Sequence, residues 1–120
     1  MTQMELLRRT KTYALRIIRL VRALPRDDVA GVLGRQLLRS GTSGGANHRA
    51  ACRATSAADF VHTLKIVEEE GDEALYGMEL LVESGLVPAR RLESLMQEGD
   101  EIAAIIVASL KTLHAACANS

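Results

Sequence analysis

Aromatic residues are almost missing from this sequence, which has two tyrosines, one phenylalanine and no tryptophan in 120 residues. Hydrophobic residues still make up 48% of the chain, so its core must be built from Leu, Ile, Val and Ala. That choice favours helices, since strands are enriched in aromatic and β-branched residues. The length and the 25% of charged residues fit one folded domain over residues 1–120 and argue against disorder.

Cysteine is also scarce. Cys52 and Cys117 are too few for a disulfide framework, and no leader-like segment precedes Leu6. The longest nearly apolar stretch, Ile102 to Leu110, is far shorter than the roughly 20 residues that span a bilayer. We therefore expect a cytoplasmic protein without a membrane helix.

Sequence motifs for catalysis are absent: there is no P-loop, dinucleotide fingerprint, nucleophile elbow or zincin motif. Asp59 and His62 resemble one arm of a di-iron bundle, but the second arm that such a site needs is missing. Two pairs of candidate zinc ligands each supply only half a site: His48 with Cys52, and His114 with Cys117. We expect a protein that is not an enzyme and holds no cofactor or metal.

Four segments have helical periodicity. The first runs from about Met4 to Leu24, with a seam that includes Leu7, Thr10, Ala14 and Ile17. The other three are predicted from a cap at Asp27 or Asp28 to about Ala54, from a cap at Ser56 to Ser84, and from about Arg90 to Ala118. Short connections force neighbouring helices to be antiparallel. The sequence therefore predicts an all-α fold, an antiparallel up-down-up-down four-helix bundle.

The second helix is the least regular of the four. Each of its five glycines costs roughly 1 kcal/mol relative to alanine inside a helix, so a break near Gly44-Gly45 is an alternative to one continuous helix. The side that we expect to face the core is small and polar, with Gln36, Ser40, Ser43 and Asn47. A buried amide must find partners, which can fix the register of packing. We expect a structural role there; a ligand site is the alternative.

Net charge is zero, but the two halves of the chain carry opposite charge. Residues 1–54 hold 11 Lys and Arg against 3 Asp and Glu, and residues 55–120 hold 4 against 12, which gives +8 and −8. The basic residues of the first helix, Arg9 and Arg16 included, fall within an arc of roughly 160°, and those of the second within roughly 80°. Our candidates for binding nucleic acid are Arg8, Lys11, Arg19, Arg22, Arg35, Arg39, Arg49 and Arg53.

Two interpretations of these arginines stay open. Guanidinium groups suit phosphate, and several phosphate contacts would give salt-sensitive, sequence-independent affinity for RNA. Without interleaved aromatic residues, such contacts would involve the backbone and not stacked bases. Alternatively, the arginines of the second helix form structural ion pairs with the acidic stripe of the third, within a subunit or across an interface. That stripe consists of Glu68, Asp72, Glu79 and Glu83.

The fourth helix is apolar around much of its circumference. Between Ile102 and Leu110 only Ser109 is polar, and Ile105 and Val107 point away from the main seam. Such a helix needs partners on more than one side. We expect Ile105 and Val107 to lie at an interface with another subunit, with deep burial as the alternative. A protein-interaction module without nucleic-acid contact is therefore the rival to an RNA-binding scaffold.

Several strings resemble the four-helix bundle proteins of the 23S rRNA intervening-sequence family. They cover roughly residues 5–88, and the fourth helix matches only in pattern. The strings are Ala14-Leu-Arg-Ile-Ile18, Gln36-Leu-Leu-Arg-Ser-Gly-Thr-Ser43, Ala46-Asn47, Arg49-Ala-Ala-Cys-Arg53, Asp59-Phe60, Glu68-Glu-Glu70 and Glu73-x-x-Tyr76-x-x-Glu79-Leu-Leu81.

This resemblance implies a bacterial cytoplasmic bundle that assembles into a homo-oligomer, often a homopentamer. Some members are encoded inside intervening sequences of 23S rRNA genes, and related bundles are accessory proteins of a reverse transcriptase. By position, the family-like core and packing residues are Ser40, Ser43, Asn47, Glu73 and Tyr76. The sequence departs from the family where Gly44 and Gly77 replace bulkier residues and His48 replaces a frequent tyrosine. An aromatic residue lost at Gly77 leaves a groove unless a neighbour fills it.

Overall fold

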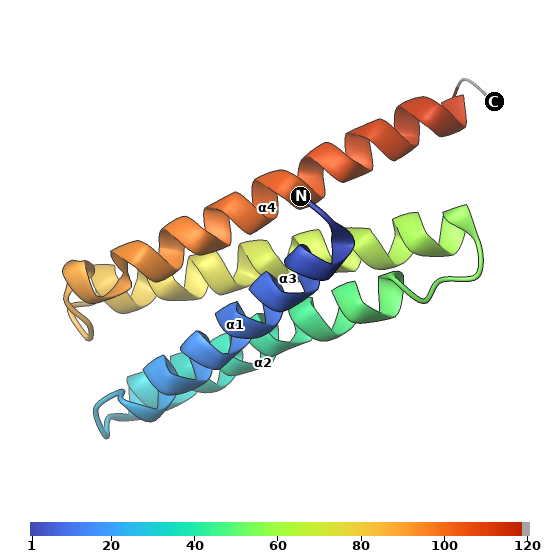
Figure 1. Cartoon of the computed structure of the whole chain (residues 1–120). Coiled ribbons are helices and arrows are strands. Elements are labelled where there is room, and N and C mark those ends of the chain that lie inside the picture. Colours follow the sequence, from blue (N-terminus) through green and yellow to red (C-terminus); the bar gives the residue numbers. More distant parts are fainter. Residues whose placement is uncertain (119–120) are drawn as a thin grey trace.

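The computed structural model describes the backbone of residues 1–118 and the side chains of residues 1–113. Four helices make up nearly all of this part of the chain: α1 (Gln3–Arg22), α2 (Asp28–Ala51), α3 (Ala57–Glu83) and α4 (Ala89–Ala118). Successive helices run in opposite directions and lie side by side as a bundle (Figure 1). No strand occurs within residues 1–118, so the predicted all-α fold is confirmed.

Capping side chains start three of the four helices, and the sequence predicts two of these caps, Asp27 and Ser56. Thr2, Asp27 and Ser56 accept hydrogen bonds from backbone N–H groups in the first turns of α1, α2 and α3. At Thr2 the cap is reciprocal, because the Glu5 carboxylate also accepts from the Thr2 N–H. The chain leaves α3 through Gly85, whose φ of 80° lies in the left-handed region that glycine adopts without strain.

The second helix is continuous through Gly44-Gly45 and ends at Ala51, three residues before the predicted end. Three of its five glycines lie where α1 and the residues just after it come close. A Cβ at Gly34 would lie 2.9 Å from Leu24 Cδ1, a Cβ at Gly41 would overlap the Ile17 side chain, and one at Gly45 would lie 3.5 Å from the Thr10 carbonyl oxygen. The packing of α1 against these glycines offsets their low helix propensity, so the alternative of a break is wrong.

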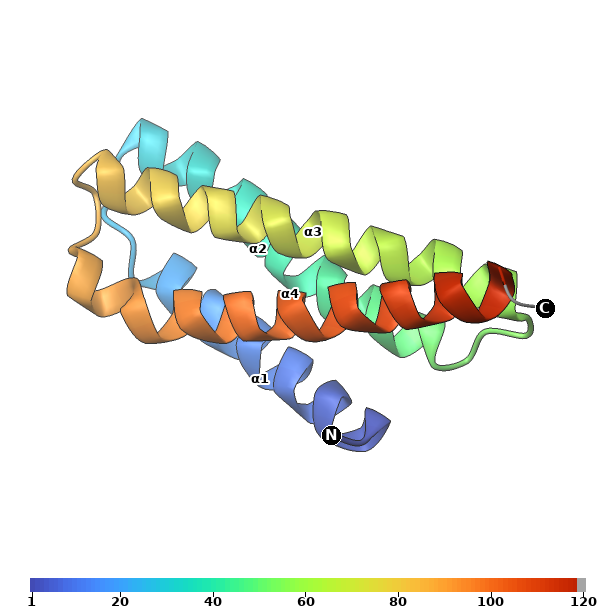
Figure 2. The same ribbon diagram turned by 90° about the horizontal axis from the view of Figure 1, so that it is seen from above.

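The helices form a ring in which each one contacts its two neighbours in sequence order, with α1 closing against α4. This last contact is the smallest, and Figure 2 shows the N-terminal half of α1 diverging from the C-terminal half of α4. The side chains buried most completely come from all four helices: Ile17, Leu37, Leu64, Met78, Leu81, Leu92 and Ile106. Within residues 1–118 no helix is long and apolar enough to cross a membrane.

The buried seam of α1 is rotated from the predicted one. Leu6, Thr10, Tyr13 and Ile17 are buried, whereas Leu7 and Ala14 are only half-buried. The rotation turns Leu7 and Ala14 toward the boundary between α1 and α2. They are therefore free to line a surface groove there.

Candidate nucleic-acid interface

A groove of about 460 Å³ lies between α1 and α2. Apolar side chains of Met4, Leu7, Ala14 and Ala46 line part of it. No aspartate or glutamate lines the groove, but four cationic residues do: Arg8, Lys11, Arg49 and Arg53.

The antiparallel packing of α1 on α2 brings these four cations together. Arg8 and Lys11 are one turn apart on α1, Arg49 lies in the last turn of α2, and Arg53 lies in the turn two residues after the end of α2. All four residues are exposed. None of them forms an ion pair with a side chain in residues 1–113. Four like charges without a counter-charge make this groove attractive to anions.

The other four predicted arginines lie elsewhere. The Arg39 guanidinium binds two carboxylates of α3, with Nη1 3.2 Å from Glu70 Oε2 and Nη2 2.7 Å from Glu73 Oε2. Helices α2 and α3 are therefore linked by ion pairs, but the predicted acidic stripe of Glu68, Asp72, Glu79 and Glu83 supplies none of them. The remaining three arginines are separated from the α1–α2 groove: Arg19 lines a second groove against α4, Arg22 is exposed near the end of α1, and Arg35 lies beside Asp27 and Asp28.

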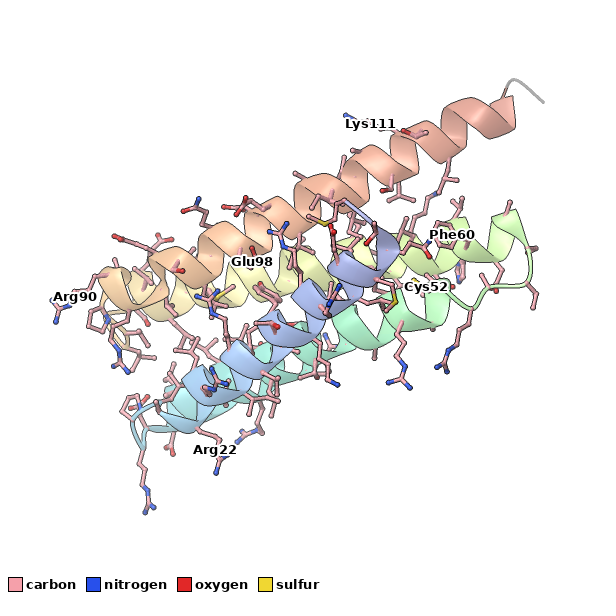
Figure 3. The ribbon with its side chains drawn as sticks, in the orientation of Figure 1. Arg22, Cys52, Phe60, Arg90, Glu98 and Lys111 are labelled. Atoms are coloured by element: carbon pink, nitrogen blue, oxygen red, sulfur yellow. The ribbon has the colours of Figure 1, made fainter. Side chains whose placement is uncertain are left out.

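Arg9 has a structural role, although the helical wheel places it on the same face as the other basic residues of α1. Its Nε donates to Glu98 Oε2 at 3.0 Å, and its Nη2 lies 3.9 Å from Glu101 Oε2. Figure 3 shows Glu98 on α4 where α1 passes. The hydrogen bond from Arg9 lowers the pKa of Glu98, because it stabilises the ionised carboxylate. Arg9 therefore fastens α1 to α4 and is not available to an anion in solution.

The small polar residues of α2 are only partly buried. Ser40 is buried and donates to the Leu37 carbonyl oxygen, while Gln36 is exposed. Asn47 is half-buried, and its Nδ2 donates to the backbone carbonyl of Ser43 at 2.9 Å and to its Oγ at 3.1 Å. These partners belong to the same helix, so the expectation that Asn47 fixes the register between helices is wrong.

The family model of the 23S rRNA-intervening sequence protein matches residues 2–108. The chain belongs to this family. A crystal structure of a protein of unknown function from the S23 ribosomal protein family of Bacteroides thetaiotaomicron is similar, with 33% sequence identity and a TM-score of 0.86. The match covers 92% of this chain and 99% of that one. No curated protein matches significantly.

In this member of the 23S rRNA-intervening sequence family, Glu73 and Tyr76 are not core residues. Tyr76 is 59% exposed, and Glu73 lies on the surface in its pair with Arg39. The expectation that the two residues pack inside the chain is wrong, because both point outward from α3. Beside them, a groove of about 300 Å³ lies at Gly77. The lack of an aromatic side chain at this position predicts such a groove unless a neighbour fills the space. Val29 and Val32, one turn from this groove on α2, are about half-exposed.

The two residues expected at a subunit interface are half-buried within this family member itself. Ile105 packs against the core cluster of its own chain, so it does not point wholly away from the bundle. Val107 is also half-buried but does not belong to that cluster. Of the two side chains, only Ile105 is therefore packed on the core cluster of its own chain.

Among the described side chains, His48 and Cys52 have no third residue nearby that could complete a zinc site. Their Nε2 and Sγ atoms are 4.0 Å apart, and residues 1–113 contain no group of three or more His, Cys, Asp or Glu side chains placed to hold a metal. Burial lowers the pKa of His48 and raises that of Cys52. His114 and Cys117 lie outside the described side chains, while Asp59 and His62 are exposed.

Proposed function

We propose that this protein is a non-enzymatic bundle that binds the phosphate backbone of structured RNA in the cytoplasm through the α1–α2 groove. The single observation that supports the proposal is the set of four unpaired cations, Arg8, Lys11, Arg49 and Arg53, lining one groove that has no carboxylate. Guanidinium groups match phosphate geometry and stay charged at any physiological pH.

The groove favours backbone contacts over base recognition. No aromatic side chain lines it, so it offers no platform for stacking. If four phosphates are neutralised, the logarithm of the binding constant falls with the logarithm of the salt concentration with a slope of about −4. Raising the salt fourfold, from about 50 to about 200 mM, would then weaken binding by roughly 250-fold.

Fluorescence anisotropy with a labelled RNA hairpin that carries a 5′-hydroxyl tests this proposal. We expect Arg49→Ser/Arg53→Ser to weaken binding at low salt and to reduce the salt slope by about 2. The matched control is Lys65→Ser/Lys111→Ser, which removes two exposed charges from α3 and α4, outside the groove. The proposal fails if wild-type protein does not bind at low salt, if its salt response is flat, or if both pairs weaken binding equally.

A second function, assembly or docking to a protein partner, is favoured by a different surface. Exposed Tyr76 lines the groove at Gly77, and half-exposed Val29 and Val32 lie one turn along α2 from the residues that line it. Large apolar side chains grouped in this way are typical of interaction sites. Self-association through this surface would give the homo-oligomer, a pentamer by family resemblance.

Light scattering tests this second proposal, because it measures the mass of the protein in solution. We expect wild-type protein to have a mass above that of one chain, and Tyr76→Arg to lower it. Since Tyr76 is 59% exposed, the substitution leaves the subunit fold intact. A monomeric wild type removes the assembly proposal and leaves the RNA proposal standing.

A further inference from the structure

A second cationic groove, of about 280 Å³, lies between the C-terminal half of α1 and the N-terminal end of α4. Three arginines line it: Arg16 and Arg19 from α1, and Arg91 from α4. The remaining lining residues are apolar, and no carboxylate is among them. Arg16 and Arg91 stand outside the set that the sequence selects for nucleic acid, and they meet Arg19 only because α1 packs antiparallel to α4.

One of the three guanidinium groups is already held in place. Arg16 Nη2 donates to Ser94 Oγ at 3.0 Å, which ties the side chain across the groove to α4. Its remaining N–H groups make no hydrogen bond within residues 1–113. A guanidinium group that is already fixed in place loses less conformational entropy when it binds an anion.

Neighbouring carboxylates do not neutralise the groove. The charge of Arg16 contributes to lowering the pKa of Glu98, but the Glu98 carboxylate is already bound by Arg9. Arg16, Arg19 and Arg91 form no ion pair within 4.0 Å among the described side chains. Three positive charges around one small groove favour a compact anion with several negative charges.

We propose that Arg16, Arg19 and Arg91 form a binding site for a phosphoryl group that carries two or more negative charges. A phosphodiester in the middle of a nucleic-acid strand has one charge and would leave two of the three cations unmatched. Two sources supply the required chemistry: the terminal phosphate of an RNA, or a free oligophosphate. This inference does not rest on the α1–α2 groove, whose cations come from the N-terminal half of α1, the C-terminal end of α2 and the turn after α2.

Calorimetric titration of the full chain with inorganic pyrophosphate tests the site directly. We expect saturable binding of one pyrophosphate per chain, and a shift of the Arg16 Nε–H signal in nuclear magnetic resonance spectra during the titration. Arg19→Ser/Arg91→Ser, which spares the Arg16 tie to Ser94, should weaken binding by roughly tenfold or more, because two charge-assisted contacts are lost.

The control is Arg22→Ser/Arg90→Ser, which also removes two positive charges: Arg22 is one turn from Arg19, and Arg90 is next to Arg91 in the sequence. Figure 3 shows Arg22 and Arg90 near the ends of α1 and α4, and neither residue lines the groove. We expect this pair to keep pyrophosphate binding within about twofold of wild type, since only long-range charge changes. Absence of saturable binding, or equal weakening by both pairs in proteins with unchanged melting temperatures, overturns the site.

Two RNA hairpins of one sequence, with a 5′-monophosphate or a 5′-hydroxyl, distinguish the sources. A terminal-phosphate site gives tighter binding of the phosphorylated hairpin, and Arg19→Ser/Arg91→Ser abolishes the difference. A site for a free oligophosphate binds pyrophosphate but treats the two hairpins alike. Either result supports the site. Arg49→Ser/Arg53→Ser leaves the α1–α4 groove intact. If this variant no longer binds the hairpin with a 5′-hydroxyl but still binds pyrophosphate, the phosphoryl site is separate from the α1–α2 groove that binds the RNA backbone.

Discussion

Replacing Gly99 by alanine tests how closely α1 and α4 approach each other. A Cβ at this position would lie 2.6 Å from Tyr13 Oη and 2.9 Å from Leu75 Cδ2, both closer than the 3.0 Å that real Cβ atoms keep. Gly99 and Tyr13 are buried, so the overlap is relieved only by moving a side chain or a helix. Overpacking of this kind costs about 1–3 kcal/mol, against a gain of up to about 1 kcal/mol in helix propensity.

We therefore expect Gly99→Ala to lower the free energy of unfolding by about 1–2 kcal/mol, as the difference between these two contributions. Urea denaturation followed by circular dichroism measures it. Gly71→Ala is the matched control, because a Cβ at Gly71 in α3 would meet nothing within 4 Å. This control should raise the free energy of unfolding by roughly 0.5–1 kcal/mol through propensity alone.

A double mutant identifies the contact responsible. Burial raises the pKa of Tyr13, and its Oη finds no hydrogen-bond partner among the described residues. Tyr13→Phe alone should therefore raise the free energy of unfolding by about 1 kcal/mol, since it removes a buried hydroxyl that has no hydrogen bond to offset its desolvation. Combined with Gly99→Ala, it should restore about 1 kcal/mol of the loss beyond this effect of the single substitution, because the closest atom is gone. Equal effects of alanine at Gly99 and Gly71, or additive behaviour in the double mutant, would refute the α1–α4 contact.

Three further predictions concern single residues. The Arg9 hydrogen bond lowers the pKa of Glu98, so ionised Glu98 stabilises the fold at pH values above 4.5, the ordinary pKa of a glutamate. This stabilisation is lost as the pH falls through the lowered pKa of Glu98 in the folded protein. The acid denaturation of Glu98→Gln should therefore lack this pH-dependent loss of stability. Burial lowers the pKa of His48, so stability should fall as pH drops below 6.5, and His48→Gln should flatten that range in urea titrations. Val107→Glu should reduce the solution mass without changing the melting temperature, whereas Ile105→Glu should also lower the melting temperature, because Ile105 packs on the core.

The sequence predicts the four helices because their caps and apolar seams are local features. It does not determine the rotation of α1. Leu6 and Leu7 are adjacent, as are Tyr13 and Ala14, so two seams one residue apart fit the same periodicity. The structure buries Leu6 and Tyr13. The choice between the two seams depends on contacts with α2 and α4, which a single-helix pattern does not contain.

The glycines of α2 show a related limit of sequence reasoning. Taken alone, Gly44-Gly45 weakens a helix, and a break is a reasonable interpretation. The structure shows instead that Gly34, Gly41 and Gly45 face α1 at short distance. Their effect on stability combines an unfavourable propensity with favourable close packing, and only the second term depends on the tertiary fold.

The candidate site is predictable as a basic surface but not as a set of residues. A helical wheel places Arg8 and Arg9 on one broad face, yet Arg8 lines the α1–α2 groove and Arg9 binds Glu98. Consecutive residues point about 100° apart around α1. Arg8 therefore faces the basic helix α2, whereas Arg9 faces the acidic helix α4. The arrangement of helices in the ring therefore decides which arginines remain unpaired.

That arrangement also explains why unpaired cations collect at the boundary between α1 and α2. The described ion pairs occur where a helix of the basic half meets a helix of the acidic half: Arg9 of α1 with α4, and Arg39 of α2 with α3. At the boundary between α1 and α2 both walls belong to the basic half, so no carboxylate lines the groove. Four like charges held together there destabilise the free protein, and a bound polyanion removes this repulsion. Because a ligand that binds only the folded state also stabilises it, charge segregation along the sequence couples folding to anion binding at this boundary.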